Sequence, residues 1–185
     1  NPDLWLAELA ERVEITNEGR EFTLYLRPGV RWHPPGNLDL GDPKYAWLRG
    51  DHFVTARDVA FSLGVIRDPK VENAALKNYY EDVEGIEVLD DHTLVVRWAK
   101  TFCGAVEATL SMPILPEFMY AYDEDGTRFP EETLGTRFNQ HWYNHRGVVG
   151  AGPYRFVSYQ PVSEIRLERF DDYVGEKPAI REIVY

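Results

Sequence analysis

The alternation of predicted β-hairpins and helices sets the fold class of this chain. Alternating apolar side chains predict two hairpins, one from residues 83–89 and 93–98 and one from residues 154–159 and 165–170. Further strands are predicted at 22–26 and 180–185, and helices at 55–67, 73–80 and 102–110. Hairpin strands are antiparallel, and helices lie between the hairpins along the sequence. The pattern therefore predicts an α+β fold with mixed, largely antiparallel sheets and inserted helices.

The clearest helix start in the sequence is at Thr55. The Thr55 side chain can accept a hydrogen bond from the backbone of Asp58, and the Asp58 side chain can reach back to the backbone N–H of Thr55. This arrangement is an acidic variant of the capping box. The apolar residues that follow at helical spacing are Val59, Leu63 and Ile66. We therefore expect the helix to begin at Thr55 and to end at Asp68-Pro69.

Composition excludes several classes of protein. The 185 residues carry a net charge of -11, so a nucleic-acid backbone would be repelled and nucleic-acid binding is not expected. No apolar run approaches the roughly 18 residues that span a bilayer. The single cysteine, Cys103, excludes an internal disulfide, and we interpret it as a small core residue. The chain opens at Asn1 and ends in the apolar run Ile183-Val184-Tyr185, so we expect it to be a piece of a longer protein.

A search for catalytic and metal-binding patterns gives no convincing site. The sequence has no Gly-x-Ser-x-Gly elbow, and its carboxylate pairs, Asp90-Asp91 and Asp171-Asp172, stand beside predicted turns. His141 and His145 have a spacing that could bind a metal on a helix, but the glutamate of zinc proteases is absent between them. The glycine run 147–152 leads into Pro153 and a strand, so we interpret it as a backbone turn rather than a phosphate loop. We predict no catalytic residue, no metal ligand and no cofactor.

Aromatic residues make up 14% of the chain, and aromatic side chains line ligand clefts as well as cores. Tyr79 and Tyr80 are adjacent at the end of a predicted helix. Because two adjacent helical residues cannot both face one core, we expect at least one of them to reach a surface or a cleft.

Six blocks of sequence follow one another in a recognisable order. They are FTLYLRPGVRWH at 22–33, VTARDVAFS at 54–62, DPK at 68–70, DDHTL at 90–94, GPYRF at 152–156 and IRLER at 165–169. Together they resemble the family 5 extracellular solute-binding proteins, which are the oligopeptide- and dipeptide-binding components of ABC importers. Three features depart from the family pattern. Residues 34–53 replace a short Asp-Gly-x-Pro turn, Phe170-Asp171-Asp172-Tyr173-Val174 replaces Asn-Pro-x-Tyr-Trp, and alanine stands near 74 or 75 where oligopeptide binders have a peptide-contacting tyrosine.

The resemblance implies that this chain is part of a two-lobed periplasmic binding protein fold. Residues 4–120 would form the small subdomain of lobe one, residues 121–147 an irregular connection and residues 148–185 a partial core sheet of lobe one. The second lobe would lie outside this sequence. We interpret 34–53 as an insertion on the surface, and we expect Tyr45 and Trp47 to order it by packing back on the small subdomain.

The resemblance also implies a function. The protein would be the substrate-binding component of an ABC importer, capturing a peptide or another small solute outside the cytoplasmic membrane by closure of its lobes. Ligand-binding residues are predicted to be Tyr79, Tyr80, Ser111 and Met112, because the segments after Asp68-Pro69 and around Ser111-Met112-Pro113 line the cleft in the family.

The implied partners are the ligand and the membrane subunits of the importer. The implied location is periplasmic or extracellular, with any membrane attachment made by an N-terminal lipid anchor outside this piece. Two alternatives remain open from the sequence, a ligand-sensing module of a regulatory protein with the same fold and a hydrolase that uses paired carboxylates.

Overall fold

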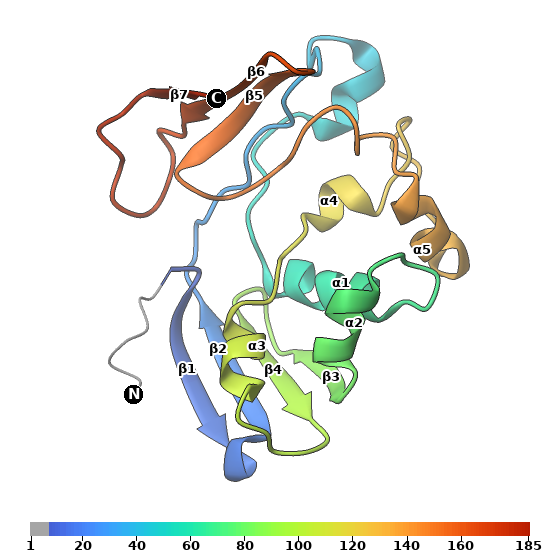
Figure 1. The fold of residues 1–185 in the computed structure, drawn as a ribbon, viewed down its shortest axis with the longest axis vertical. Helices are drawn as coiled ribbons and strands as arrows, with labels where there is room; N and C mark the ends of the chain where they lie inside the picture. The colour runs from blue at the N-terminus through green and yellow to red at the C-terminus, as the bar shows by residue number, and fades with distance from the viewer. Residues whose placement is uncertain (1–7) are drawn as a thin grey trace. The chain divides into compact units, whose positions relative to one another are not determined.

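A computed structural model describes residues 8–185 and divides the chain into two compact units. Unit 1 combines the stretch that ends at Pro28 with Thr55–Ile114, and unit 2 combines Gly29–Val54 with Leu115–Tyr185. Each unit is therefore built from two separate stretches of chain (Figure 1). The predicted boundaries at residues 120 and 147 do not coincide with this division, and residues 4–7 of the predicted small subdomain lie outside the described residues.

Unit 1 contains a four-stranded antiparallel sheet with the strand order β1-β2-β4-β3. The strands are β1 (Ala10–Thr16), β2 (Glu21–Leu26), β3 (Val83–Val88) and β4 (Thr93–Trp98), with a short 3-10 turn, η2 (Asn17–Gly19), between the first two. The structure confirms the predicted hairpin of β3 and β4 and the predicted strand β2. Strand β1 was not predicted, because three of the seven residues of AERVEIT are charged and most of its side chains are exposed.

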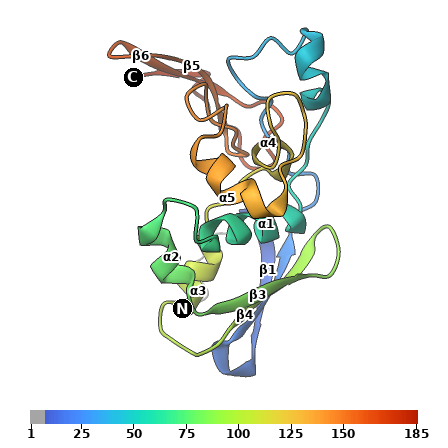
Figure 2. The ribbon, with the colours of Figure 1, turned by 90° about the vertical axis from the view of Figure 1, so that its right-hand side faces the viewer.

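Three helices cover one face of this sheet (Figures 1 and 2). They are α1 (Ala56–Arg67), α2 (Ala74–Tyr80) and α3 (Ala105–Leu110). The predicted start of α1 is confirmed, because a carboxylate oxygen of Asp58 accepts the backbone N–H of Thr55 at 2.8 Å and the Thr55 hydroxyl at 3.3 Å. The carboxylate thereby satisfies a donor at the helix N-terminus that has no partner within the helix.

The core of unit 1 lies between the sheet and the helices. Alternate residues of β2 and β4 point into it, among them Phe22 and Leu94, which have no exposed surface. The helices contribute Val59, Leu63 and Ile66 from α1 and Ala105 and Ala108 from α3. Val95 and Val96 of β4 are both buried although they face opposite sides of the sheet.

The first stretch of unit 2 is a closed loop. Backbone hydrogen bonds from Trp32 to His52 and from Val54 to Val30 hold its two ends together. Inside the loop a 3-10 helix, η3 (Pro43–Leu48), buries Leu48 almost completely. Most of residues 37–53 keep solvent exposure, in line with a surface excursion, and within η3 only Tyr45 and Leu48 are buried. The expectation that Tyr45 and Trp47 pack on the small subdomain is wrong, because they pack on residues of the second stretch of unit 2.

The second stretch of unit 2 contains two helices, α4 (Glu117–Tyr120) and α5 (Glu131–Asn139). Helix α5 corrects the expectation that residues 121–147 are wholly irregular. Signals for both ends of this helix were present in the sequence. Pro130 and two glutamates mark its start, and Arg137 stands in its last turn.

Unit 2 ends in a three-stranded antiparallel sheet with the order β5-β6-β7. Its strands are β5 (Tyr154–Gln160), β6 (Glu164–Arg169) and β7 (Glu182–Val184), so the predicted second hairpin and final strand are confirmed. Every residue of these strands keeps some solvent exposure, unlike the central strands of unit 1. No helix in the described part of the chain is both long and apolar enough to cross a membrane.

Candidate functional site

The four predicted ligand residues fall into different environments in unit 1. Tyr79 is 67% exposed, whereas Tyr80 is 4% exposed and its hydroxyl donates to the carbonyl oxygen of Ala108 at 3.0 Å. Met112 belongs to the same core cluster as Tyr80. Ser111 is exposed, and its hydroxyl donates to the carbonyl oxygen of Glu107 at 2.7 Å. One of the two tyrosines therefore reaches the surface, as expected, and the other completes the core beside α3.

A cavity of about 500 Å³ opens between β1, β2 and the end of α3 in unit 1. Ser111 and Met112 line this cavity, and the two tyrosines are not among the described residues that do so. Its walls are mostly apolar, from Leu24, Leu26, Val59, Leu110 and Ile114, and its charged groups are Glu8, Glu11 and Arg12 of the segment at β1. Such a lining suits an apolar group and offers few polar contacts to orient it.

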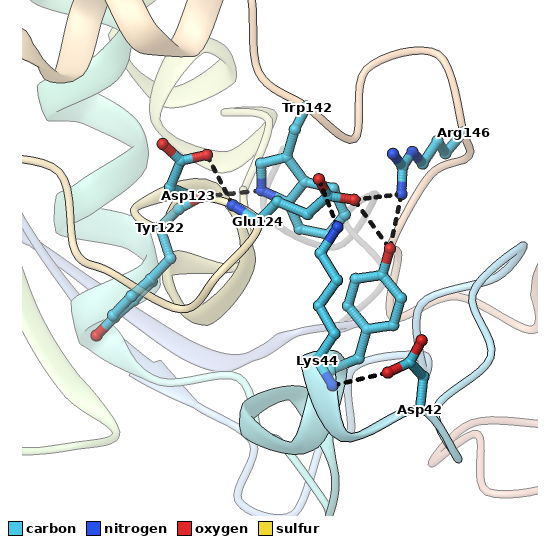
Figure 3. Close-up of polar contacts among 8 residues, drawn as sticks. Asp42, Lys44, Tyr122, Asp123, Glu124, Trp142 and Arg146 are labelled. Carbon is cyan, nitrogen blue, oxygen red and sulfur yellow. Dashed lines mark hydrogen bonds and ion pairs between the residues drawn. The ribbon is translucent and has the colours of Figure 1, made fainter.

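Polar side chains of unit 2 converge on the carboxylate of Glu124, in the loop after α4 (Figure 3). The hydroxyl of Tyr45 donates to Glu124 Oε1 at 2.9 Å, and the guanidinium of Arg146 lies 2.8 Å from the same oxygen. The ammonium of Lys44 lies 2.8 Å from the other carboxylate oxygen. The Arg146 guanidinium also donates to the Tyr45 hydroxyl at 3.0 Å. We call Lys44, Tyr45, Glu124 and Arg146 the Glu124 cluster.

The Glu124 cluster holds its carboxylate in the ionised form. Hydrogen bonds from Lys44 and Tyr45, together with Arg146, lower the pKa of Glu124 to about 2. The same contact with Glu124 raises the pKa of Lys44. A carboxyl group that is ionised at neutral pH and has both oxygens occupied cannot donate a proton in catalysis. The cluster therefore acts as a clamp that fastens η3 to the second stretch of unit 2.

Aromatic rings extend this clamp. The rings of Tyr45 and Trp142 stack with 6.1 Å between their centroids and 13° between their planes, and the Arg146 guanidinium lies 5.3 Å from the Trp142 ring. The indole N–H of Trp142 donates to the carbonyl oxygen of Tyr122 at 3.1 Å, and the ring of Trp47 contacts the Tyr122 ring. Sequence reasoning missed these contacts, because Tyr45 lies 79 residues from Glu124 and 101 from Arg146.

Two histidines of unit 2 are buried and bonded to backbone. The backbone N–H of His33 donates to the carbonyl oxygen of Gly150 at 2.7 Å, and its ring Nε2 lies 2.9 Å from the carbonyl oxygen of Gly152. His141 Nε2 lies 3.0 Å from the carbonyl oxygen of Tyr122. Because burial disfavours the imidazolium, the pKa values of both rings are lowered.

The contacts of the glycine run support its interpretation as a structural turn. Besides the two carbonyl groups that face His33, a side chain at Gly147 would place its Cβ 2.8 Å from the Tyr143 hydroxyl and 2.9 Å from the Phe156 ring. Gly147 is therefore needed for close packing. The two histidines at metal-binding spacing lie in different environments, because His141 is buried and His145 is exposed. The described residues contain no group of three potential metal ligands.

A second cavity, of about 610 Å³, lies in unit 2 between the loop 144–148 and the β5–β6 hairpin. Its apolar lining includes Val148, Tyr159 and Ile165, which are 62%, 54% and 40% exposed. The Asn37 side-chain amide, also in the lining, donates to the carbonyl oxygen of Arg146 at 2.6 Å. This cavity is open to solvent and largely apolar, and it shares Arg146 with the Glu124 cluster.

Comparison with known proteins places this chain among binding proteins. The dipeptide-binding protein of Escherichia coli (strain K12) is 28% identical over 192 residues, which cover 96% of this chain and 31% of that protein. The oligopeptide-binding protein OppA of Bacillus subtilis (strain 168) is 24% identical over 167 residues, covering 89% of this chain and 28% of that protein. The chain thus spans about three tenths of the length of the curated relatives it matches.

Solved structures share the fold. NikZ from Campylobacter jejuni, in complex with Ni(L-His), matches with a TM-score of 0.71 at 19% identity over 96% of this chain and 29% of that one. MoaA from A. tumefacien R10, in complex with mannopinic acid, matches with a TM-score of 0.66 at 28% identity over the whole of this chain and 31% of that one. The α+β arrangement is therefore that of part of a two-lobed periplasmic binding protein, as the resemblance implied.

The family model described as bacterial extracellular solute-binding proteins, family 5 Middle, matches residues 6–185. That match covers nearly the whole sequence and includes both units. The chain belongs to the bacterial extracellular solute-binding proteins of family 5.

Proposed function

We propose that the full-length protein is the substrate-binding component of an ABC importer, capturing a small solute outside the cytoplasmic membrane. The observation that carries the proposal is the family match over residues 6–185, which spans both compact units rather than one motif. The word extracellular in the family description supports a periplasmic or extracellular location. The membrane subunits of the importer and an N-terminal lipid anchor are parts of the same proposal.

A peptide is the leading candidate for the solute. The two curated relatives described above are named for binding a dipeptide and an oligopeptide. The structural neighbours hold other cargo, a nickel–histidine complex in one and mannopinic acid in the other. The names of the two curated relatives denote chains of amino acids. The proposed ligand class is therefore a short peptide or a related amino-acid derivative.

Binding without covalent chemistry is also part of the proposal. The carboxylates beside the predicted turns accept hydrogen bonds in the way turn residues do, since Asp90 accepts the backbone N–H of His92 at 2.8 Å, which lowers its pKa. Asp171 is paired with Arg169 at 2.8 Å, and this contact lowers the pKa of Asp171. Neither carboxylate has the raised pKa that favours a general acid.

Ligand contact by Tyr79, Tyr80, Ser111 and Met112 stays a prediction, and the structure separates them by what each can offer. Tyr79 offers an exposed phenol, and Ser111 and Met112 line the cavity of unit 1. Tyr80 offers little, because its ring and hydroxyl are already occupied in the core. Met112 is part of the core as well, so Tyr79 and Ser111 are the residues whose substitution tests the predicted ligand surface most directly.

The proposal is tested by purifying the full-length protein, denaturing it and identifying the released small molecules by mass spectrometry. We expect short peptides or amino-acid derivatives in stoichiometric amount. Titration calorimetry with the identified compound then measures affinity, and a turnover assay with the same compound follows any chemical change. Recovery of no solute together with catalytic turnover of peptides would contradict the proposal.

A further inference from the structure

The five histidines are unevenly placed between the two units. His33, His52, His141 and His145 belong to unit 2, whereas the described residues of unit 1 contain only His92, in the turn between β3 and β4. Two of those in unit 2, His33 and His141, are 3% and 2% exposed. Both lie outside regular strands and helices, and the ring of each contacts a backbone carbonyl group.

Both ring nitrogens of His141 are engaged. Nε2 lies 3.0 Å from the carbonyl oxygen of Tyr122, and Nδ1 accepts the backbone N–H of Tyr143 at 3.3 Å. This pattern fixes the neutral tautomer with its proton on Nε2. A second proton would have to sit on Nδ1, where it would face the N–H of Tyr143. Protonation therefore removes this hydrogen bond and sets two donors against each other.

The Tyr143 backbone that would be disturbed lies at the centre of unit 2. The Tyr143 side chain has no exposed surface, and its hydroxyl donates to the carbonyl oxygen of Gly36 at 2.9 Å. Loss of the His141 contact would therefore loosen the connection between the two stretches that build unit 2.

His33 connects the first stretch of unit 2 to the glycine run of the second stretch. Its ring packs edge-on against Phe170 with 4.7 Å between centroids, and it holds the carbonyl groups of Gly150 and Gly152 through its backbone and its ring. A charged His33 ring would pack against the apolar ring of Phe170, and no carboxylate is among the groups that shift its pKa. The nearby charged group is Arg155 of β5, which repels an imidazolium.

The groups around His141 act in both directions. The carboxylate of Asp123 and the carbonyl groups of Tyr122 and Met119 favour the charged ring, but burial outweighs them. The other faces of the ring are covered by Tyr120, Phe129 and Trp142, with centroid distances of 5.1, 6.0 and 5.5 Å. Tyr120 and Tyr143 are titratable but stay neutral well above neutral pH, because burial raises the pKa of each.

We propose that His33 and His141 form an acid-sensitive latch in unit 2. Protonation of the two rings loosens residues 119–143 and 150–152 and leaves the packing of the unit 1 core unchanged. The latch does not depend on which solute the protein binds. It would make one half of this chain responsive to the acidity of an extracellular environment and leave the other half unresponsive.

The direction of the pH effect follows from linkage. Burial lowers the pKa of both histidines in the folded unit, so folding favours their neutral forms. Their contribution to stability is complete above the unfolded pKa of about 6.5 and is lost as the pH falls towards the lower folded value. Between the unfolded and folded pKa values, each fall of one pH unit raises the equilibrium constant for opening by about tenfold for each histidine that becomes charged on opening.

The test is hydrogen exchange of the full-length protein, measured by mass spectrometry at about pH 7.5 and about pH 5.5 and corrected for the intrinsic pH dependence of exchange. Peptides from 119–143 and 150–152 should show increased opening at the lower pH, and peptides from β4 should not. His33→Gln and His141→Gln should each reduce this pH dependence, and His145→Gln, at an exposed histidine of unit 2, should keep it. Equal pH dependence in both units would overturn the proposal.

A second measurement keeps the proposal testable if the glutamine variants do not fold. The pKa values of the five histidines can be read in the wild-type protein from the pH dependence of their ring Cε1–H resonances. His33 and His141 should titrate below the ordinary histidine pKa of about 6.5, and titration of His141 should coincide with faster exchange of the Tyr143 amide. Titration of both rings at or above the ordinary histidine value of about 6.5 would overturn the latch.

Discussion

Removing the charge of Glu124 tests whether the clamp on η3 stabilises unit 2. In Glu124→Gln, the amide keeps one oxygen for an incoming donor and turns an NH₂ group towards either Lys44 or the Tyr45–Arg146 pair. One of these donors then faces another donor. The pKa shift of Glu124 from 4.5 to about 2 corresponds to an upper limit of roughly 3 kcal/mol of stabilisation by the ionised form.

Solvent screening reduces this value. The side chain of Glu124 is 26% exposed and that of Lys44 is 46% exposed, and partly exposed ion pairs contribute less than buried ones. We therefore expect Glu124→Gln to lower the free energy of unfolding of unit 2 by about 1 to 2 kcal/mol at pH 7. The loss can be measured by urea denaturation followed through tryptophan fluorescence, because Trp47 and Trp142 lie at the clamp.

The pH dependence separates the clamp from a general loss of packing. Because the folded pKa of Glu124 lies below its usual value, its contribution is present above about pH 4.5 and is lost as the pH falls towards 2. The stability difference between wild type and Glu124→Gln should therefore shrink over this range. Glu176→Gln, at an exposed carboxylate of the same unit, is the matched control. Parallel stability curves for wild type and Glu124→Gln from pH 7 to pH 2.5 would refute the electrostatic argument.

Three further predictions concern unit 1. Thr55→Ala should cost roughly 1 kcal/mol of stability in urea denaturation, since α1 loses a capping partner of Asp58, and Thr55→Ser should recover most of it; an unchanged midpoint for the alanine variant would exclude a stabilising cap. Leu94→Ala should cost about 2 to 5 kcal/mol because Leu94 is fully buried in β4, and a loss below about 1 kcal/mol would mean that the core tolerates the cavity. Tyr80→Ala should lower the melting temperature strongly, whereas Tyr79→Ala should leave it within error and, if Tyr79 faces the solute, weaken binding in calorimetry; equal melting of the two variants would contradict their assigned environments.

The fold could be predicted from the sequence wherever a local signal was strong. Strand β2, the β3–β4 hairpin and the start of α1 each carry an alternating or capping pattern within a few residues, and the structure confirms all three. Strand β1 could not be found in this way, because it is an edge strand whose side chains are mostly exposed, so no burial pattern is imposed on its sequence. Its pairing with β2 is decided by tertiary contact.

The candidate site was less accessible to sequence reasoning. The adjacent tyrosines on a helix predicted that at least one of Tyr79 and Tyr80 would reach a surface or a cleft, but the sequence could not say which. The Glu124 cluster could not be predicted, because no local motif marks its members and they come from separate parts of the sequence. They meet only in the folded unit. The buried state of His141 was likewise hidden, since it depends on rings contributed by α4 and by the segment around Phe129.

The interleaving of the two units has a consequence for how the chain can fold during synthesis. Strand β2 lies between β1 and β4, so its sheet cannot be completed until β4 has left the ribosome, and the stretch Gly29–Val54 has no core until Leu115–Tyr185 follows. Unit 1 can therefore complete its core only once Ile114 has left the ribosome, with Gly29–Val54 held out as a loop, and unit 2 must wait for Leu115–Tyr185. Pairings this distant along the chain raise the contact order and slow folding. The apolar side chain of Phe22 consequently stays uncovered until unit 1 has been made, and that of Leu48 stays uncovered longer, until the second stretch of unit 2 follows.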